Sequence, residues 1–134
     1  MQEFKTFDEV LAFAGTDQEK EFFSNPELQS QFEPDEIAYR KMKIITRAFN
    51  TDPKTKKVWT PDWYDSKEWK YYPWFNMSPD EKDSSGVGFS YDGYDYDFAS
   101  SDVGSRLCFR TSEAATYAGK QFLDIYKDYF IIRK

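Results

Sequence analysis

The sequence predicts an α+β fold: N-terminal helices, then a small antiparallel β-meander of about four strands, then a C-terminal amphipathic helix. Apolar residues recur at helical spacing within 7–14, 34–50 and 111–130. Between the last two segments, residues 70–110 are rich in aromatic side chains and contain Asp92-Gly93, a pair typical of a tight hairpin turn. The 134 residues amount to one domain, which divides into a helical part (1–50), a loop (51–69), the meander (70–110) and the last helix (111–130).

Local signals predict where the N-terminal helices begin and end. Thr6 and Glu9 form a capping-box pattern and Gly15 is a natural stop, so the first helix is expected over residues 7–14. Residues 16–34 are polar and broken by prolines, which indicates one or two short helical turns. Pro34 then opens a longer helix that is expected to end near Asn50.

The rest of the chain predicts four strands and a final helix. The strands are expected at 70–76, 86–91, 94–100 and 104–110, with a polar loop at 78–86 and a hairpin turn at Asp92-Gly93. Pro73 cannot donate to a ladder, so the first strand should be of the edge type. The final helix should follow Thr111, because apolar residues then repeat at 3-4-3-4 spacing. The repeating residues are Ala115, Ala118, Phe122, Ile125 and Tyr129.

Aromatic side chains are the unusual feature of the composition. Thirteen Phe, ten Tyr and four Trp make up 20% of the chain, more rings than so small a domain can bury. The Trp-rich block at 59–74 can be read as core, since Leu and Ile are scarce. The Tyr residues of the expected hairpin should instead be exposed beside small polar groups, a composition typical of binding surfaces. The candidate ligand-binding residues are Tyr91, Asp92, Tyr94, Asp95, Tyr96 and Asp97.

Four motifs in this order resemble an uncharacterised family of small proteins from gut anaerobes, their prophages and their phages. They are Trp59-Thr60-Pro61-Asp62-Trp63, Lys70-Tyr71-Tyr72-Pro73-Trp74-Phe75, Val103-Gly104-Ser105-Arg106-Leu107-Cys108-Phe109 and Tyr117-Ala118-Gly119-Lys120-Gln121-Phe122. The resemblance covers about residues 36–130 and departs from the family pattern near 51–58, where this chain carries extra residues. It implies a phage-associated setting and no catalytic residue.

A weaker similarity links residues 86–109 to the closing strands of C-type-lectin-like domains, which gives an alternative fold. In retroelement-diversified members of that class, variable positions are drawn from a set that includes Phe, Ser, Tyr, Asp, Gly and Ala. Residues 89–100 contain only those six types. The segment from Trp59 to Arg110 is short for a complete lectin-like domain.

The sequence argues against most catalytic chemistries. It has no His, and its one Cys, Cys108, has no base to activate it and no partner for a disulfide. The Asp residues at 92–102 match no EF-hand spacing, and Gly86-Val87-Gly88 lacks a phosphate-loop context. We therefore expect no enzyme activity, no cofactor and no metal. Without a leader-like start or a long apolar run, a cytoplasmic or virion-associated protein is expected, with no membrane contact.

Charge leaves two rival functions open. The net charge is −6, yet residues 40–57 carry seven basic side chains and one acid. A nucleic-acid-associated accessory role would use the basic residues of this segment, although a solvated helix face explains the same stripe. They are Arg40, Lys43, Arg47, Lys54, Lys56 and Lys57. The other rival is a virion component that forms homo-oligomers through exposed rings. The leading hypothesis is a non-enzymatic module that binds a protein or glycan.

Overall fold

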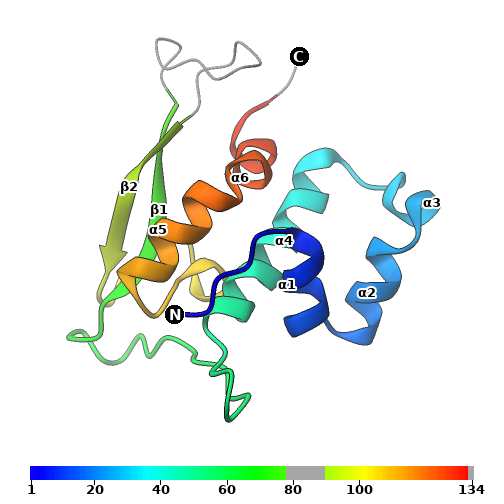
Figure 1. Ribbon diagram of the computed structural model, residues 1–134. Helices are drawn as coiled ribbons and strands as arrows, with labels where there is room; N and C mark the ends of the chain where they lie inside the picture. Colours follow the sequence, from blue (N-terminus) through cyan, green and yellow to red (C-terminus); the bar gives the residue numbers. More distant parts are fainter. Residues whose placement is uncertain (78–89, 133–134) are drawn as a thin grey trace.

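The computed structural model of the protein describes residues 1–77 and 90–132, without the side chains of 90–92. In chain order the elements are α1 (Phe7–Ala14), α2 (Asp17–Phe23), α3 (Pro26–Gln29), α4 (Pro34–Phe49), β1 (Lys70–Asn76), β2 (Ser90–Asp97), the 3-10 helix η1 (Ser105–Leu107), α5 (Ser112–Gln121) and α6 (Leu123–Phe130). The predicted α+β class is confirmed. The sheet lies at one side of the molecule, α5 and α6 pack beside it, and α4 separates them from α1–α3 (Figure 1).

Helices α1 and α4 begin and end as predicted because their signals are local, and α2 and α3 lie where short helical turns were expected. Thr6 Oγ1 accepts from the Glu9 amide at 3.3 Å, and α1 stops at Gly15. Thr16 and Glu19 form a reciprocal capping box on α2. Pro34 occupies the first turn of α4, whose buried face consists of Ala38, Met42, Ile44, Ile45, Thr46 and Ala48.

The predicted hairpin turn at Asp92-Gly93 is wrong. Gly93 lies inside β2 opposite Trp74, and Tyr91 lies opposite Phe75, so Asp92 is the extra residue of a β-bulge. Gly93 has φ of 152°, which L side chains rarely adopt, and this explains the glycine without a turn. The two strands are joined instead by residues 77–89. Most of the strand expected at 86–91, and the loop expected at 78–86, lie outside the described residues.

The predicted meander of four strands is not found in the described part of the chain, where the sheet has two strands. The segment expected as a fourth strand, 104–110, turns through η1 and pairs only at Phe109, which exchanges two backbone hydrogen bonds with Tyr71 (3.1 and 2.7 Å). The amide of the next residue, Arg110, points away from β1 and donates to Asn50 Oδ1 at 2.9 Å. The strand expected at 94–100 also ends early, at Asp97.

The C-terminal helix is divided at Phe122, whose φ of −109° and ψ of 32° interrupt the helix. The break lets α6 turn onto α4, against which it packs. It also changes the buried face: Tyr126 is 3% exposed, whereas Tyr129, expected on that face, is 37% exposed. The 3-4-3-4 pattern therefore holds in α5 and fails in α6.

The N-terminal segment packs against α5, near the other end of the sequence, and completes the core. Phe4 is 3% exposed and packs against Phe13 and Phe49. Tyr117 Oη donates to the Phe4 carbonyl at 2.8 Å, and Gln121 donates to the Lys5 carbonyl at 2.7 Å. These bonds join residues more than a hundred positions apart.

Replacing Tyr126 by Phe should leave stability unchanged or raise it by up to about 1 kcal/mol. The Tyr126 hydroxyl is buried and makes no hydrogen bond with the described residues. Burial raises the pKa of this hydroxyl, an effect that the neighbouring Thr46 partly offsets. Because the variant removes a desolvated polar atom and keeps the ring, urea unfolding of the two proteins should show no loss. A loss above about 1 kcal/mol would mean that the hydroxyl has a partner.

Candidate binding surfaces

Strand alternation gathers five rings on one face of the sheet, here called the aromatic face. Its members are Trp69, Tyr71, Tyr94, Tyr96 and Phe98. Trp69 stacks on Tyr96, with ring centroids 4.5 Å apart and planes 20° apart. Phe98 meets Trp69 edge-on at 5.2 Å, and Tyr71 meets Tyr94 at 5.5 Å. The rings therefore support one another in a continuous cluster, as offset and edge-to-face pairs do.

Much of this cluster is accessible. Trp69 is 45% exposed, Tyr94 46% and Tyr96 42%. Tyr71, by contrast, is half-buried and packs against the main core. The aromatic face thus joins the core at β1 and opens to solvent toward β2.

Along the residues of β2 that the structure describes, no further strand pairs with the edge that faces away from β1. Tyr71 exchanges its backbone bonds with Phe109, so its N–H and C=O point away from β2. Tyr96 lies opposite Tyr71 and is therefore a non-hydrogen-bonded partner whose backbone groups point outward. The Tyr96 amide is satisfied by the adjacent Asp95 Oδ1 at 2.8 Å. Pro73 lies two residues after Tyr71, so its backbone nitrogen also points away from β2. The N–H that proline lacks therefore removes no hydrogen bond between the two strands.

The structure separates the candidate ligand-binding residues into two groups. Tyr94 and Tyr96 belong to the aromatic face, whereas alternation directs Asp95 and Asp97 to the opposite face. There Asp97 Oδ2 accepts the Asp102 amide at 3.1 Å. The side chains of Tyr91 and Asp92 lie outside the described ones. The described tyrosines and aspartates therefore do not form one mixed surface.

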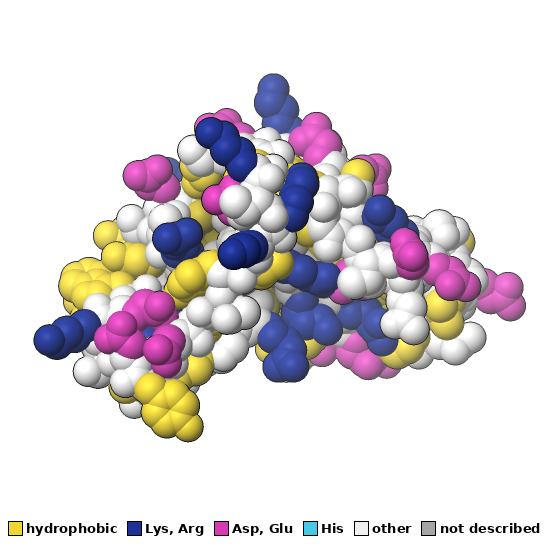
Figure 2. Space-filling view, turned by 90° about the horizontal axis from the view of Figure 1, so that it is seen from below, with side chains coloured by type: hydrophobic (Ala, Val, Ile, Leu, Met, Phe, Trp, Pro, Cys, Tyr) yellow, Lys and Arg dark blue, Asp and Glu magenta, His cyan; other side chains and the backbone are white. Residues whose placement is uncertain are grey.

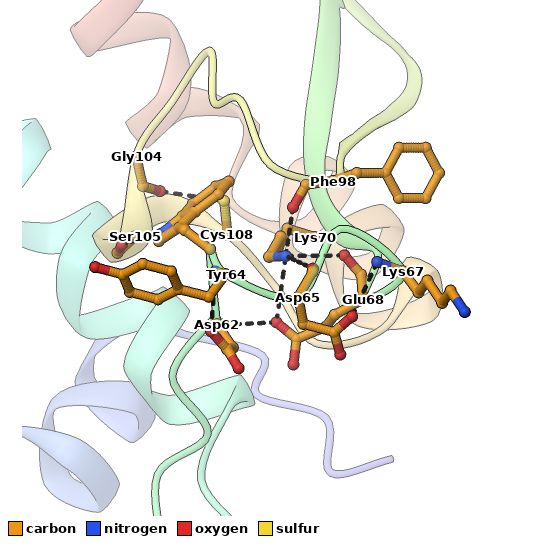
Figure 3. A network of polar contacts seen from close by, with 11 residues as sticks. Asp62, Tyr64, Asp65, Lys67, Glu68, Lys70, Phe98, Gly104, Ser105 and Cys108 are labelled. Atoms are coloured by element: carbon orange, nitrogen blue, oxygen red, sulfur yellow. Dashed lines mark hydrogen bonds and ion pairs between the residues drawn. The ribbon is translucent and has the colours of Figure 1, made fainter.

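A buried lysine anchors the opposite face, which residue patterns did not identify. Lys70 is 0% exposed, and its ammonium donates to the carbonyl oxygens of Asp65 (2.9 Å), Glu68 (3.0 Å) and Phe98 (Figure 3). The Glu68 carboxylate lies 3.6 Å away, and the Trp63 ring centroid 5.1 Å away. One charge therefore fixes the loop before β1 to the chain leaving β2. The sequence signal that could have identified Lys70 is its spacing of two residues from Tyr72, which places both buried side chains on the same face of β1.

Two other polar groups on this side are unsuited to catalysis. Tyr72 Oη donates to Asp102 Oδ2 at 2.8 Å, and burial and this bond raise the pKa of Tyr72 far above its usual value. Cys108 is fully buried and donates to the Gly104 carbonyl at 3.1 Å. Burial raises the pKa of the Cys108 thiol to about 12. At neutral pH the thiol is protonated and not accessible as a nucleophile.

The Trp-rich block is neither wholly core nor wholly surface. Tyr72 is buried, and Trp63 is half-buried with its Nε1 donating to Ser105 Oγ at 2.6 Å. Trp74 is 48% exposed, and Tyr64 protrudes completely. Reading this block as core therefore holds for only some of its rings.

The basic residues of 40–57 do not form one continuous track. The Arg40 guanidinium lies 4.4 Å from the Phe22 centroid and 4.6 Å from that of Phe32. Arg47 forms a bidentate pair with Glu19 (2.9 and 2.6 Å). Both guanidinium groups therefore already contact other side chains of the protein.

The remaining cations of this segment are divided between a loop and a helix. Lys56 lies 4.4 Å from the Phe13 centroid, and Lys54 and Lys57 are exposed on the loop after α4. Lys43 projects from α4, and its ammonium lies 5.4 Å from the Tyr39 centroid. An extended nucleic-acid track would therefore have to use residues that lie on separate parts of the surface.

Comparison of the chain with family profiles, curated proteins and solved structures finds no match. Within residues 1–77 and 90–132, no helix is long and apolar enough to cross a bilayer. The same residues contain no cluster of three or more Cys, Asp or Glu side chains that could hold a metal ion.

Proposed function

We propose that this protein is a non-enzymatic recognition module that binds a protein or a glycan through the aromatic face. The observation that carries the proposal is that Trp69, Tyr94 and Tyr96 lie in one cluster and are each more than two-fifths exposed. Rigid rings held by their neighbours lose little conformational entropy on binding, which makes them effective contact residues. A phage- or prophage-associated setting belongs to this proposal through the motif resemblance.

Of the two ligand classes, the geometry favours a protein. Trp69 and Tyr96 cover one face of each other, which removes ring faces on which a sugar would stack. Ring edges remain open, and protein partners contact edges and faces alike. The outward backbone groups of Tyr94 lie beside the rings and can accept or donate hydrogen bonds to a partner's main chain.

The double variant Tyr94→Ser/Tyr96→Ser should lose ligand capture. Immobilised wild-type protein is exposed to host-cell extract and to a glycan array, and bound species are compared with those of the variant. Removing two exposed rings deletes most of the proposed contact area, so signals should fall at least about tenfold. Tyr64→Ser is the matched control, since Tyr64 is 101% exposed and distant in sequence from β2.

Equal capture by the wild type and the double variant would show that the aromatic face is not the binding surface. Light scattering on the same proteins tests the oligomeric alternative. If the wild type self-associates and the double variant is monomeric, the partner is a second copy of the chain.

A further inference from the structure

A second surface, here called the basic cleft, lies between α4, residues 58–61 and η1. Its volume is about 560 Å³. The side chains that matter for binding are Lys43, Arg47, Trp59, Thr60, Ser105 and Arg106. No carboxylate from the described part of the chain is among its lining residues. Seen from below, Lys and Arg side chains gather near the centre of the molecule, and acidic side chains lie mostly around them (Figure 2).

Two of the three cations are unneutralised. Arg47 is paired with Glu19 and also donates to the Ala14 carbonyl at 3.3 Å. Lys43 and Arg106 have no carboxylate within 4.0 Å among the described residues. In a protein of net charge −6, two such cations in one hollow create a local positive potential that attracts an anion.

The walls of the basic cleft are fixed by internal bonds. The Trp59 amide donates to the Asn50 carbonyl at 2.8 Å, which holds the Trp59 wall against the end of α4. Ser105 Oγ accepts from Trp63 Nε1 at 2.6 Å, which holds the η1 wall. Because Ser105 Oγ accepts this bond, its own proton stays available for a ligand. Walls that are already fixed require little ordering on binding.

We infer that the basic cleft binds a phosphorylated ligand with a flat ring, of the nucleotide class. Arg106 contacts the phosphate, and Lys43, whose ammonium lies 5.4 Å from the Tyr39 ring centroid in the free protein, turns on its flexible side chain to contact it too. A guanidinium and an ammonium are the side chains that recognise phosphate best. Trp59 stacks on the flat ring, as aromatic side chains do with bases. The hydroxyls of Thr60 and Ser105 supply neutral hydrogen bonds. This site is separate from the aromatic face and does not depend on its function.

The test is calorimetric titration of the full chain with adenosine 5′-monophosphate and with inorganic phosphate, in about 50 mM salt. Arg106→Gln and Lys43→Gln should each weaken binding of both probes about tenfold, since each removes a charge-assisted contact. Trp59→Leu should weaken the nucleotide about tenfold and leave phosphate unchanged. Lys54→Gln, an exposed lysine outside the cleft, should change neither affinity.

Each other outcome would overturn the inference. Neither probe binding the wild type, or binding that Arg106→Gln and Lys43→Gln leave intact, would remove the site. Phosphate binding with no added affinity for the nucleotide would remove the ring-binding role of Trp59. A single-stranded oligonucleotide that binds far more tightly than the mononucleotide would replace the small-ligand site by a nucleic-acid surface.

Discussion

Lys70→Met should destabilise the protein by about 3–5 kcal/mol. The substitution keeps an unbranched side chain that reaches as far as Cε and removes the ammonium. The carbonyls of Asp65, Glu68 and Phe98 then lose their common donor, and each partly buried acceptor left without a partner costs part of this free energy. Urea unfolding followed by far-UV circular dichroism measures the difference.

Lys67→Met is the control for this prediction. Lys67 is exposed, and its side chain points away from the network (Figure 3), so its replacement should change stability by no more than about 0.5 kcal/mol. Near-UV circular dichroism adds a second readout. Lys70 holds the Phe98 carbonyl, so the ring cluster of Trp69, Tyr96 and Phe98 should lose part of its fixed arrangement in Lys70→Met alone. Equal stability of the two variants would rule out the anchoring role.

Asn50→Leu should cost about 2–4 kcal/mol. Asn50 is 7% exposed and lies directly after α4. Its Nδ2 donates to the Cys108 carbonyl at 2.8 Å, and its Oδ1 accepts from the Arg110 amide at 2.9 Å. Leucine has the same branching as asparagine but leaves a buried carbonyl and a partly buried amide without a partner, so thermal and urea unfolding should both show the loss.

A second asparagine gives the comparison. Asn25 caps α3 through one bond from the Leu28 amide at 3.0 Å, and it is exposed. Asn25→Leu should therefore cost only about 1 kcal/mol. If Asn50→Leu were no more destabilising than Asn25→Leu, water or a rearranged backbone must replace both bonds of Asn50.

The N-terminal helices could be located from the sequence because their boundaries depend on neighbouring residues. Thr6 and Pro34 act within one turn of their own helix, and no distant contact competes with them. The sheet could not be predicted in this way. Asp92-Gly93 suits a hairpin turn and a bulge equally well, and only the pairing of Trp74 with Gly93 decides between them.

The candidate surfaces show the same limit. Alternation along β2 places Tyr94 and Tyr96 on the same face, and that pattern can be read from the sequence because it is local. The role of Lys70 depends on the Phe98 carbonyl, 28 residues along the chain, as well as on those of Asp65 and Glu68 in the loop before it, so a local pattern can indicate only that Lys70 is buried. Likewise, nothing near Arg40 in sequence indicates that Phe22 and Phe32 lie against its guanidinium.

The contact between Phe4 and Tyr117 constrains the order in which the protein acquires its structure during synthesis. A nascent chain cannot complete its core until α5 has emerged from the ribosome, since until then Phe4 lacks the hydroxyl that binds its carbonyl. Helix α4 would meanwhile expose the apolar surface that α5 and α6 later cover. Premature termination just before residue 112 should therefore release a fragment that chaperones or proteases engage, instead of a stable half-domain.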